Sequence, residues 1–268
     1  MLFQAMATAH VFDNPPWRLW LAFFPAAMII YGIGLVFARW AFHRTYEGAV
    51  ITGMGASYGN TLLLGIPLIF LVLGEEGLLA GLLIISAHSL ILMTLTTVLL
   101  EGGRAEGGGT LEIMRGVVLG MVTNPVILGL VAGLTWNALA LPIPGVLNQV
   151  LLFLKGAVVP CSLFALGATL ARYGMKGRLA QSLVVTVLKL LVMPAIVWVS
   201  ATYILELNVI WTAAAVLMAA QPTGVNMYLF ASRYGTAEAI ASTTIFVSTL
   251  AAVVVMPVLI YLLGVTQS

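Results

Sequence analysis

The sequence predicts an all-α integral membrane protein, a helical bundle, because of its composition and the length of its apolar runs. Of its 268 residues, 62% are hydrophobic and 7% are charged, and the mean hydropathy is +1.11. Soluble domains carry roughly a quarter charged residues. The runs between polar breaks are about 20 to 28 residues long, which suits helices that cross a hydrocarbon core of about 30 Å. Barrel strands are much shorter, so a helical bundle follows.

Eight apolar runs are long enough to cross the bilayer. They span Trp17–Phe42, Tyr46–Gly74, Gly77–Leu100, Met114–Ala140, Val146–Ala171, Leu179–Leu205, Val209–Ser232 and Ala237–Val265. A glycine-rich stretch, EGGRAEGGGTLE, follows the third run and is too polar to lie in lipid. The apolar stretch Met1–Phe12 is too short to cross and lacks the basic start of a signal peptide. We therefore expect eight helical crossings.

The basic residues predict the orientation of the chain. Alternate loops carry most of them: Arg39, Arg44, Arg104, Arg115, Arg172, Lys176, Arg178 and Arg233. The loops on the opposite side carry only Arg18. Because short cytoplasmic loops are enriched in Lys and Arg, the basic side is expected to be cytoplasmic. We expect a multi-pass protein of the cell membrane (inner or plasma), with its C-terminus outside the cytoplasm.

Three pairs of short matches predict an internal duplication. The stretch LFQAMATA from Leu2 matches LFALGATL from Leu163 at four of eight positions, and FFPAA around Pro25 resembles VMPAI around Pro194. The stretch YGNTLLLGIP falls where the second half has AQPTGVNMY. All three pairs keep their order and lie about 161 to 169 residues apart. Chance similarity among apolar residues is the alternative for any one match, but it explains three ordered matches poorly.

The duplication divides the chain into three parts. Residues 1–101 form a first, incomplete repeat, 102–113 a cytoplasmic glycine-rich loop, and 114–268 a second repeat of five helices. The first repeat holds three helices and the tail of a fourth, so we expect an N-terminal truncation. Repeats with an odd number of helices lie in the membrane in opposite directions, which makes them inverted repeats.

Two of the expected helices carry residues that break helices. The stretch with Pro67 and the stretch with Pro222 each combine proline and glycine with polar side chains, and both should unwind near the middle of the membrane. The ends of such half-helices offer free N–H groups that favour anions. Nearby side chains can fix the ligand by hydrogen bonds: Asn60, Thr61, Gln221, Thr223 and Asn226. Ordinary proline kinks with polar residues that join helices are the alternative.

Ionisable residues within the spans favour an anionic ligand. Lys189, Lys155 and His88 fall at lipid depth, whereas the acidic residues lie in loops or at span ends. Lys189 has an alternative role in snorkelling or in capping a carbonyl of a broken helix, and Lys155 one as an interfacial anchor. For His88 the alternatives are a hydrogen-bonded packing role and a proton-linked role.

Several functional classes lack the residues that they need. An intramembrane protease requires paired aspartates, HExxH or a serine with a base, and the one aspartate is Asp13 in a loop. Lipid phosphotransferases need acidic metal ligands within their helices. The single cysteine, Cys161, excludes an internal disulfide and a CxxC site. Basic residues are scattered rather than clustered, so nucleic acid is not expected as a partner. We expect no enzyme activity, metal site or cofactor.

Four motifs occur together in order: YGNTLLLGIPL, TNPVILGLVAGL with Asn124 and Pro125, CSLFALGATLA, and QPTGVNMYLFASRYG. They resemble the auxin efflux carrier family, which includes plant auxin exporters and bacterial permeases for malate, malonate and related acids. The resemblance covers essentially the whole chain. It implies a ten-helix fold of two inverted five-helix repeats, in which a transport domain moves against a scaffold domain like an elevator. It also implies crossover helices at Pro67 and Pro222 and a substrate carboxylate site at Asn60.

The chain is therefore expected to be a malate or malonate permease-like secondary transporter of a small organic acid anion, a monocarboxylate, a dicarboxylate or an auxin-like acid. Lys189 is expected to neutralise the anion or to stabilise the crossover. Distant bile-acid symporter relatives use sodium, but no sodium-binding cluster is evident here, which favours uniport or proton coupling with His88 as a candidate. A homodimer remains open. The alternatives are a channel or sensor on a transporter fold and a non-transporting membrane fragment.

Overall fold

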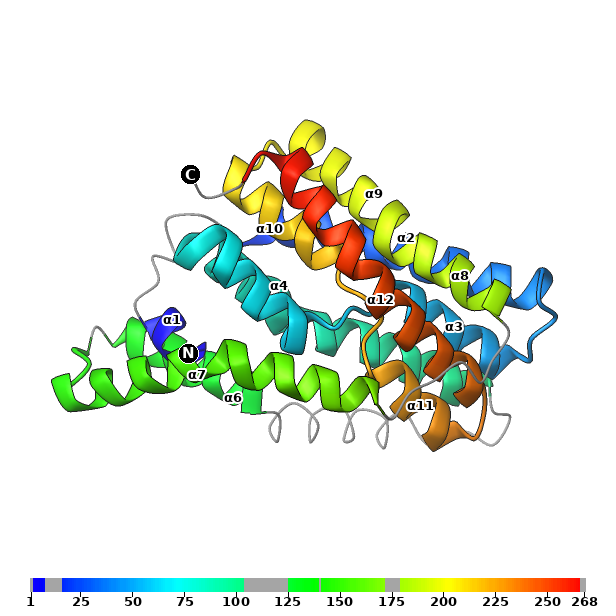
Figure 1. Ribbon diagram of the computed structural model, residues 1–268, viewed down its shortest axis with the longest axis horizontal. Helices are drawn as coiled ribbons and strands as arrows, with labels where there is room; N and C mark the ends of the chain where they lie inside the picture. The colour runs from blue at the N-terminus through cyan, green and yellow to red at the C-terminus, as the bar shows by residue number, and fades with distance from the viewer. Residues whose placement is uncertain (1, 8–15, 104–124, 140, 172–178, 266–268) are drawn as a thin grey trace.

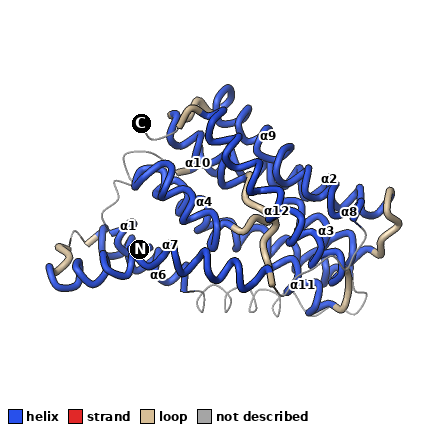
Figure 2. Tube along the Cα trace, viewed as in Figure 1, coloured by secondary structure: helices blue, strands red, loops and turns tan. Residues whose placement is uncertain are grey.

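The computed structural model describes residues 2–7, 16–103, 125–139, 141–171 and 179–265. Within these ranges the regular structure is helical apart from one isolated β-bridge (Figure 2). This confirms the all-α class. Most of the glycine-rich loop, the start of the crossing expected from Met114, and the basic residues between 172 and 178 lie outside the described residues.

The elements run in the following order. They are α1 (Leu2–Ala7), α2 (Trp17–Trp40), α3 (Tyr46–Ser57), the π-helix η1 (Thr61–Gly65), α4 (Ile66–Gly103), α6 (Pro125–Ala138), α7 (Gly145–Leu170), α8 (Leu179–Val187), the π-helix η2 (Leu188–Val192), α9 (Met193–Val199), the π-helix η3 (Ser200–Ile204), α10 (Val209–Ala219), α11 (Asn226–Tyr234) and α12 (Glu238–Leu263).

Four helical segments of the described chain are long and apolar enough to cross a membrane. They are Trp17–Trp40, Thr61–Gly103, Leu179–Ile204 and Glu238–Leu263. The remaining expected crossings correspond to α6, to α7, to α3, and to the pair α10 and α11. Two of the eight expected crossings are interrupted, between α3 and η1 and between α10 and α11. The interruptions fall in the two stretches where proline, glycine and asparagine predict them.

Proline positions explain some of the wider turns. Pro67 lies inside the continuous helical segment Thr61–Gly103, and the chain is broken earlier, between Ser57 and Thr61. The stretch is thus broken as expected, but at its start, about two helical turns before Pro67. The π-helices η1 and η2 each end two residues before a proline, Pro67 and Pro194. A wider turn accommodates the proline ring and the carbonyl that it leaves unpaired.

Helix α4 doubles back on itself at Gly74. This glycine has φ 66° and ψ −151°, a conformation that glycine adopts at little cost. A Cβ built on Gly81 would lie 3.6 Å from Cγ2 of Ile69, so the two arms of α4 lie against each other. The boundary expected between the second and third crossings is thus confirmed.

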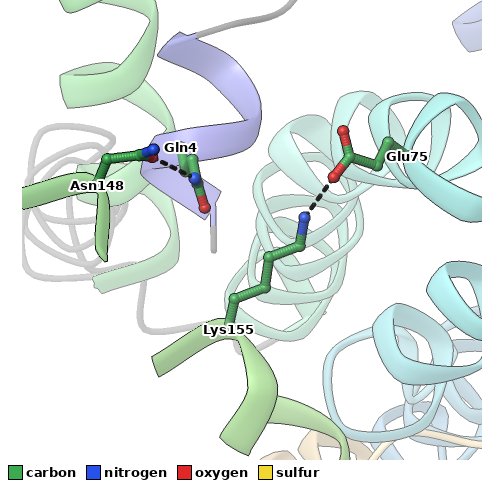
Figure 3. A network of polar contacts seen from close by, with 4 residues as sticks. All are labelled: Gln4, Glu75, Asn148 and Lys155. Carbon is green, nitrogen blue, oxygen red and sulfur yellow. Dashed lines mark hydrogen bonds and ion pairs between the residues drawn. The ribbon is translucent and has the colours of Figure 1, made fainter. Parts of the chain in front are cut away.

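The helices form two groups (Figure 1). The first group, α1, α6 and α7, lies along one edge: α1 packs on α6, and Gln4 of α1 donates from Nε2 to Oδ1 of Asn148 in α7 at 2.8 Å. The other helices form a larger group, in which α2 packs on α3, α10 on α4, and α12 on α8. An ion pair joins the groups: Nζ of Lys155 in α7 lies 2.6 Å from Oε1 of Glu75 in α4 (Figure 3).

The larger group contains the core, and small residues allow its helices to approach closely. Large side chains such as Phe23, Ile51 and Met54 are fully buried there. Where α2 crosses α3, a Cβ on Gly34 would lie 2.8 Å from Cβ of Ala56, and one on Gly53 would lie 2.7 Å from the carbonyl oxygen of Tyr31. Glycine at both positions brings the two backbones together, as is usual for helices packed within membranes.

We expect Gly34→Ala to destabilise the protein by about 1–3 kcal/mol, because its new methyl group forces α2 and α3 apart. Gly32→Ala is the matched control on the same helix, since a Cβ there meets nothing within 4 Å. Thermal unfolding of both variants in detergent measures the difference. Equal unfolding temperatures would contradict the close packing of α2 on α3.

Candidate functional site

The two interrupted helices cross, and their unwound residues pair with each other. Gly59 and Thr223 form an antiparallel bridge. The backbone N–H of Asn60 donates to the carbonyl oxygen of Pro222 at 2.7 Å, and that of Gly224 donates to the carbonyl oxygen of Tyr58 at 2.9 Å. Unpaired backbone groups are costly in an apolar interior, so this pairing is what permits both breaks. We call this feature, residues 58–60 against 222–224, the crossover.

Thr223 fastens the crossover to two further helices. Its side-chain Oγ1 donates to the carbonyl oxygen of Gly55 in α3 at 2.9 Å, and its backbone N–H donates to Oγ of Ser248 in α12 at 3.1 Å. Thr223 is fully buried. Its hydroxyl is therefore engaged in holding the crossover together, although the sequence predicts a ligand contact. Ser248 is an additional residue of the site, and the sequence gives no local signal for it within its apolar helix.

Asn60 and Thr61 combine a capping role with donors that remain free. Oδ1 of Asn60 accepts from the N–H of Leu63 at 3.3 Å and caps η1. No described residue forms a hydrogen bond with Nδ2 of Asn60 or with Oγ1 of Thr61. Both residues are largely but not completely buried, with 7% and 6% of their surface exposed. Two unengaged polar groups therefore lie at the first break.

Two side chains cap the end of α10, where the second break begins. Gln221 turns back, and its Nε2 donates to the carbonyl oxygen of Leu217 at 2.9 Å. Lys189, which is fully buried on η2, donates from Nζ to the carbonyl oxygen of Ala219 and contacts Sδ of Met193 at 3.5 Å. A cation at a helix C-terminus is favourable, because the last carbonyls and the helix dipole are negative there. This contact agrees with the role in which Lys189 caps a carbonyl of a broken helix.

Gly59 provides the space for Lys189. A Cβ on Gly59 would lie 3.3 Å from both Cε and Nζ of Lys189 and 3.1 Å from Cβ of Gln221. Any larger residue would therefore push the ammonium group away from the helix end. The sequence shows a glycine before Asn60, but only the structure shows what approaches it.

Tyr58 connects the crossover to α4, and the sequence does not single it out. Its hydroxyl accepts from Nδ2 of Asn226 at 2.7 Å and lies 2.8 Å from Oγ of Ser89. Its ring packs edge-on against the imidazole of His88, with the centroids 4.5 Å apart. Asn226 is thus held by a side chain from the other broken helix.

His88 is buried without a hydrogen bond. Only 1% of its surface is exposed, and the ring lies between those of Tyr58 and Phe23. Among the described residues, neither Nδ1 nor Nε2 has a hydrogen-bond partner. The expected hydrogen-bonded packing role is therefore wrong for this conformation. Gln221 Oε1 is a second buried atom at the crossover without a partner in the described chain.

The buried polar residues include basic groups and no acidic ones among the described residues. Lys189 and His88 are the basic members of the buried polar set, and that set includes no carboxylate among the described residues. Lys155 lies in α7 beside Glu75, with its ammonium 4.9 Å from the centre of the Phe70 ring. No three His, Cys, Asp or Glu side chains of the described chain gather closely enough to hold a metal ion. An anion would meet no buried negative charge here.

The structure brings most of the predicted site residues together. Those at the crossover are Asn60, Thr61, Gln221, Pro222, Thr223 and Asn226. Lys189 joins them through Gly59, and His88 through Tyr58. Pro67 differs, because it lies within α4 beyond η1.

Comparisons with known proteins identify the family of this sequence. The sequence pattern of the family described as "Membrane transport protein" matches residues 1–260. A protein of Rhizobium meliloti named "Putative malonate transporter" is 30% identical over 235 residues, which cover 88% of this chain and 72% of the relative. An "Uncharacterized transporter" of Methanothermobacter thermautotrophicus is 26% identical over 241 residues, covering 88% of this chain and 77% of the relative.

Thr223→Val should destabilise the protein by about 1–3 kcal/mol, because the carbonyl oxygen of Gly55 loses its donor inside an apolar interior. Thr223→Ser keeps the hydroxyl, so its stability should be closer to that of the parent protein. Thermal unfolding in detergent compares the two. If Thr223→Val proved as stable as Thr223→Ser, this hydrogen bond would not stabilise the crossover.

Proposed function

Because this chain belongs to the membrane transport protein family, which is the auxin efflux carrier family, we propose that it is a secondary carrier of a small organic acid anion. The family is one of transporters and is not an enzyme class. The name of the Rhizobium relative includes malonate, which supports a short carboxylate as the substrate of this chain too. Monocarboxylates and auxin-like acids are the other members of the proposed class.

One observation carries the proposal. Nδ2 of Asn60 and Oγ1 of Thr61 are polar groups without partners among the described residues, beside a break in a membrane helix. Polar groups within a membrane protein interior are costly and commonly mark a substrate path. A carboxylate accepts hydrogen bonds from amide and hydroxyl donors, and no buried carboxylate of the described chain competes with it. Asn60 and Thr61 are therefore the proposed carboxylate ligands.

The remaining polar residues of the crossover receive supporting roles. Asn226 and Gln221 complete the proposed pocket, and Pro222 and Thr223 keep the second broken helix in position. Lys189 stabilises the end of α10 and adds positive potential for an anion.

The two helix groups support an elevator-type mechanism of alternating access. In this proposal α1, α6 and α7 form the scaffold, and the larger group with the crossover moves against it (Figure 1). Residues 1–101 and 114–268 are proposed to be inverted repeats, which places one broken helix in each. The loop of residues 102–113 would lie in the cytoplasm and the C-terminus outside, in a cell membrane.

The carrier is proposed either to work without a coupling ion or to move protons together with its substrate. A homodimer is the proposed assembly.

Uptake into liposomes by the purified chain tests the proposal. Radiolabelled malonate, acetate and an aromatic acid are offered separately, with and without a pH gradient. Saturable uptake of one of them supports a carrier, and its response to the gradient tests proton coupling. Conductance without saturation would favour a channel, and no flux at all from folded protein would overturn the organic-acid carrier.

Two substitutions at Asn60 separate ligand binding from helix capping. Asn60→Asp keeps the oxygen that caps η1 but replaces the amide donor by a carboxylate that repels an anion. We expect it to abolish uptake while the cap of η1 is retained. Asn60→Ala should also abolish uptake, with a loss of about 1 kcal/mol of stability because the cap is removed. Substantial uptake by Asn60→Asp would show that Asn60 serves the helix and not the substrate.

Crosslinking tests whether the two groups move. In a Cys161→Ser background, Lys155→Cys with Glu75→Cys joins α7 to α4 through a flexible bifunctional thiol reagent, and we expect linking to stop uptake. Gln4→Cys with Asn148→Cys is the matched control, since both residues lie in the first group (Figure 3). Linking that pair should leave uptake intact. Uptake that persists in a fully linked Lys155/Glu75 pair would contradict the elevator.

A further inference from the structure

We propose that a second polar subsite, centred on His88, binds the other carboxylate of the substrate and makes this carrier select dicarboxylates over monocarboxylates. The inference rests on the proposed function, in which Asn60 holds the first carboxylate. It assigns a substrate-selecting role to a residue of α4 that lies outside both breaks.

The strongest observation is the unsatisfied imidazole. Burying a polar group without a hydrogen bond typically costs about 1–3 kcal/mol, and both ring nitrogens of His88 lack a partner among the described residues. A neutral imidazole always carries one N–H donor, and a carboxylate is a strong acceptor for it. A leucine would fill the same space without this cost, so the position is better explained by a ligand than by packing.

The neighbours of His88 provide additional hydrogen-bonding groups. Tyr58, Ser89 and Asn226 form a chain of hydrogen bonds whose members come from the first break, α4 and α11. Ser89 and Asn226 are only half-buried, so this cluster reaches the surface of the interior, although His88 itself is closed in. A ligand that displaces the Tyr58 hydroxyl from Asn226 would meet the imidazole next.

The subsite adjoins the first break, because His88 packs against Tyr58. Tyr58 precedes Asn60 by two residues. The Cα atoms of Tyr58 and Asn60 are therefore at most about 7 Å apart. The charge environment permits a second carboxylate, because Lys189 lies beside Gly59 and no carboxylate of the described residues is buried at the crossover. The neutral imidazole contributes a hydrogen-bond donor and not a charge.

The test compares malonate with monomethyl malonate, which has nearly the same size and one carboxylate fewer. Uptake into liposomes gives KM and the maximal rate for each acid. The parent protein should prefer malonate. His88→Leu should raise the KM for malonate roughly ten- to a hundredfold, the loss of a charge-assisted hydrogen bond, and should leave monomethyl malonate nearly unchanged. His88→Gln retains a donor, so its KM for malonate should lie between those of the parent protein and of His88→Leu.

The controls separate selectivity from folding. His43→Gln changes a histidine in the connection between α2 and α3 and should behave like the parent protein. His88→Leu removes an unsatisfied polar group, so its unfolding temperature should be equal or higher. A parent protein that prefers the monoester, a malonate preference that survives in His88→Leu, or equal losses for both acids would each overturn the subsite. If the parent transports neither acid but takes up acetate or an aromatic acid, the inference alone fails, whereas no uptake of any acid overturns the proposed function as well.

Discussion

Pairing of backbone hydrogen-bonding groups in an apolar interior is the constraint on which the rest of the structure depends. An unwound helix within a membrane protein exposes donors and acceptors that lipid cannot satisfy. The two breaks meet this demand by pairing with each other through Gly59 and Thr223, so that each break satisfies backbone groups of the other. Some polar side chains at the crossover hold it together, and a smaller number remain for a ligand.

Local sequence predicts helices and breaks well here, because both depend on nearby residues. Apolar runs define the helices, and the glycine, asparagine and proline around Asn60 and Pro222 mark the interruptions. The exact place of a break is less predictable. Asn60 caps the helix that follows it, so the chain unwinds before Asn60, and Pro67 is accommodated by a wide turn.

Roles that depend on contacts between distant segments could not be predicted from the sequence. Nothing near Tyr58 indicates that its hydroxyl will hold Asn226, and nothing near Thr223 indicates that its hydroxyl will be used by α3. Lys189 has two plausible roles from sequence, and the position of the α10 carbonyl decides in favour of capping in this conformation. Composition predicts the sign of the interior charge, while the partners of each charged group follow only from the fold.

The antiparallel bridge has a consequence for biosynthesis. Gly59 leaves the ribosome long before Thr223, and at about 5–20 residues per second the intervening chain takes on the order of ten to thirty seconds to translate. During this interval the first break has no strand to pair with. The N-terminal half is therefore expected to wait at the insertion machinery, or beside water, and to enter its final position only when the second half arrives.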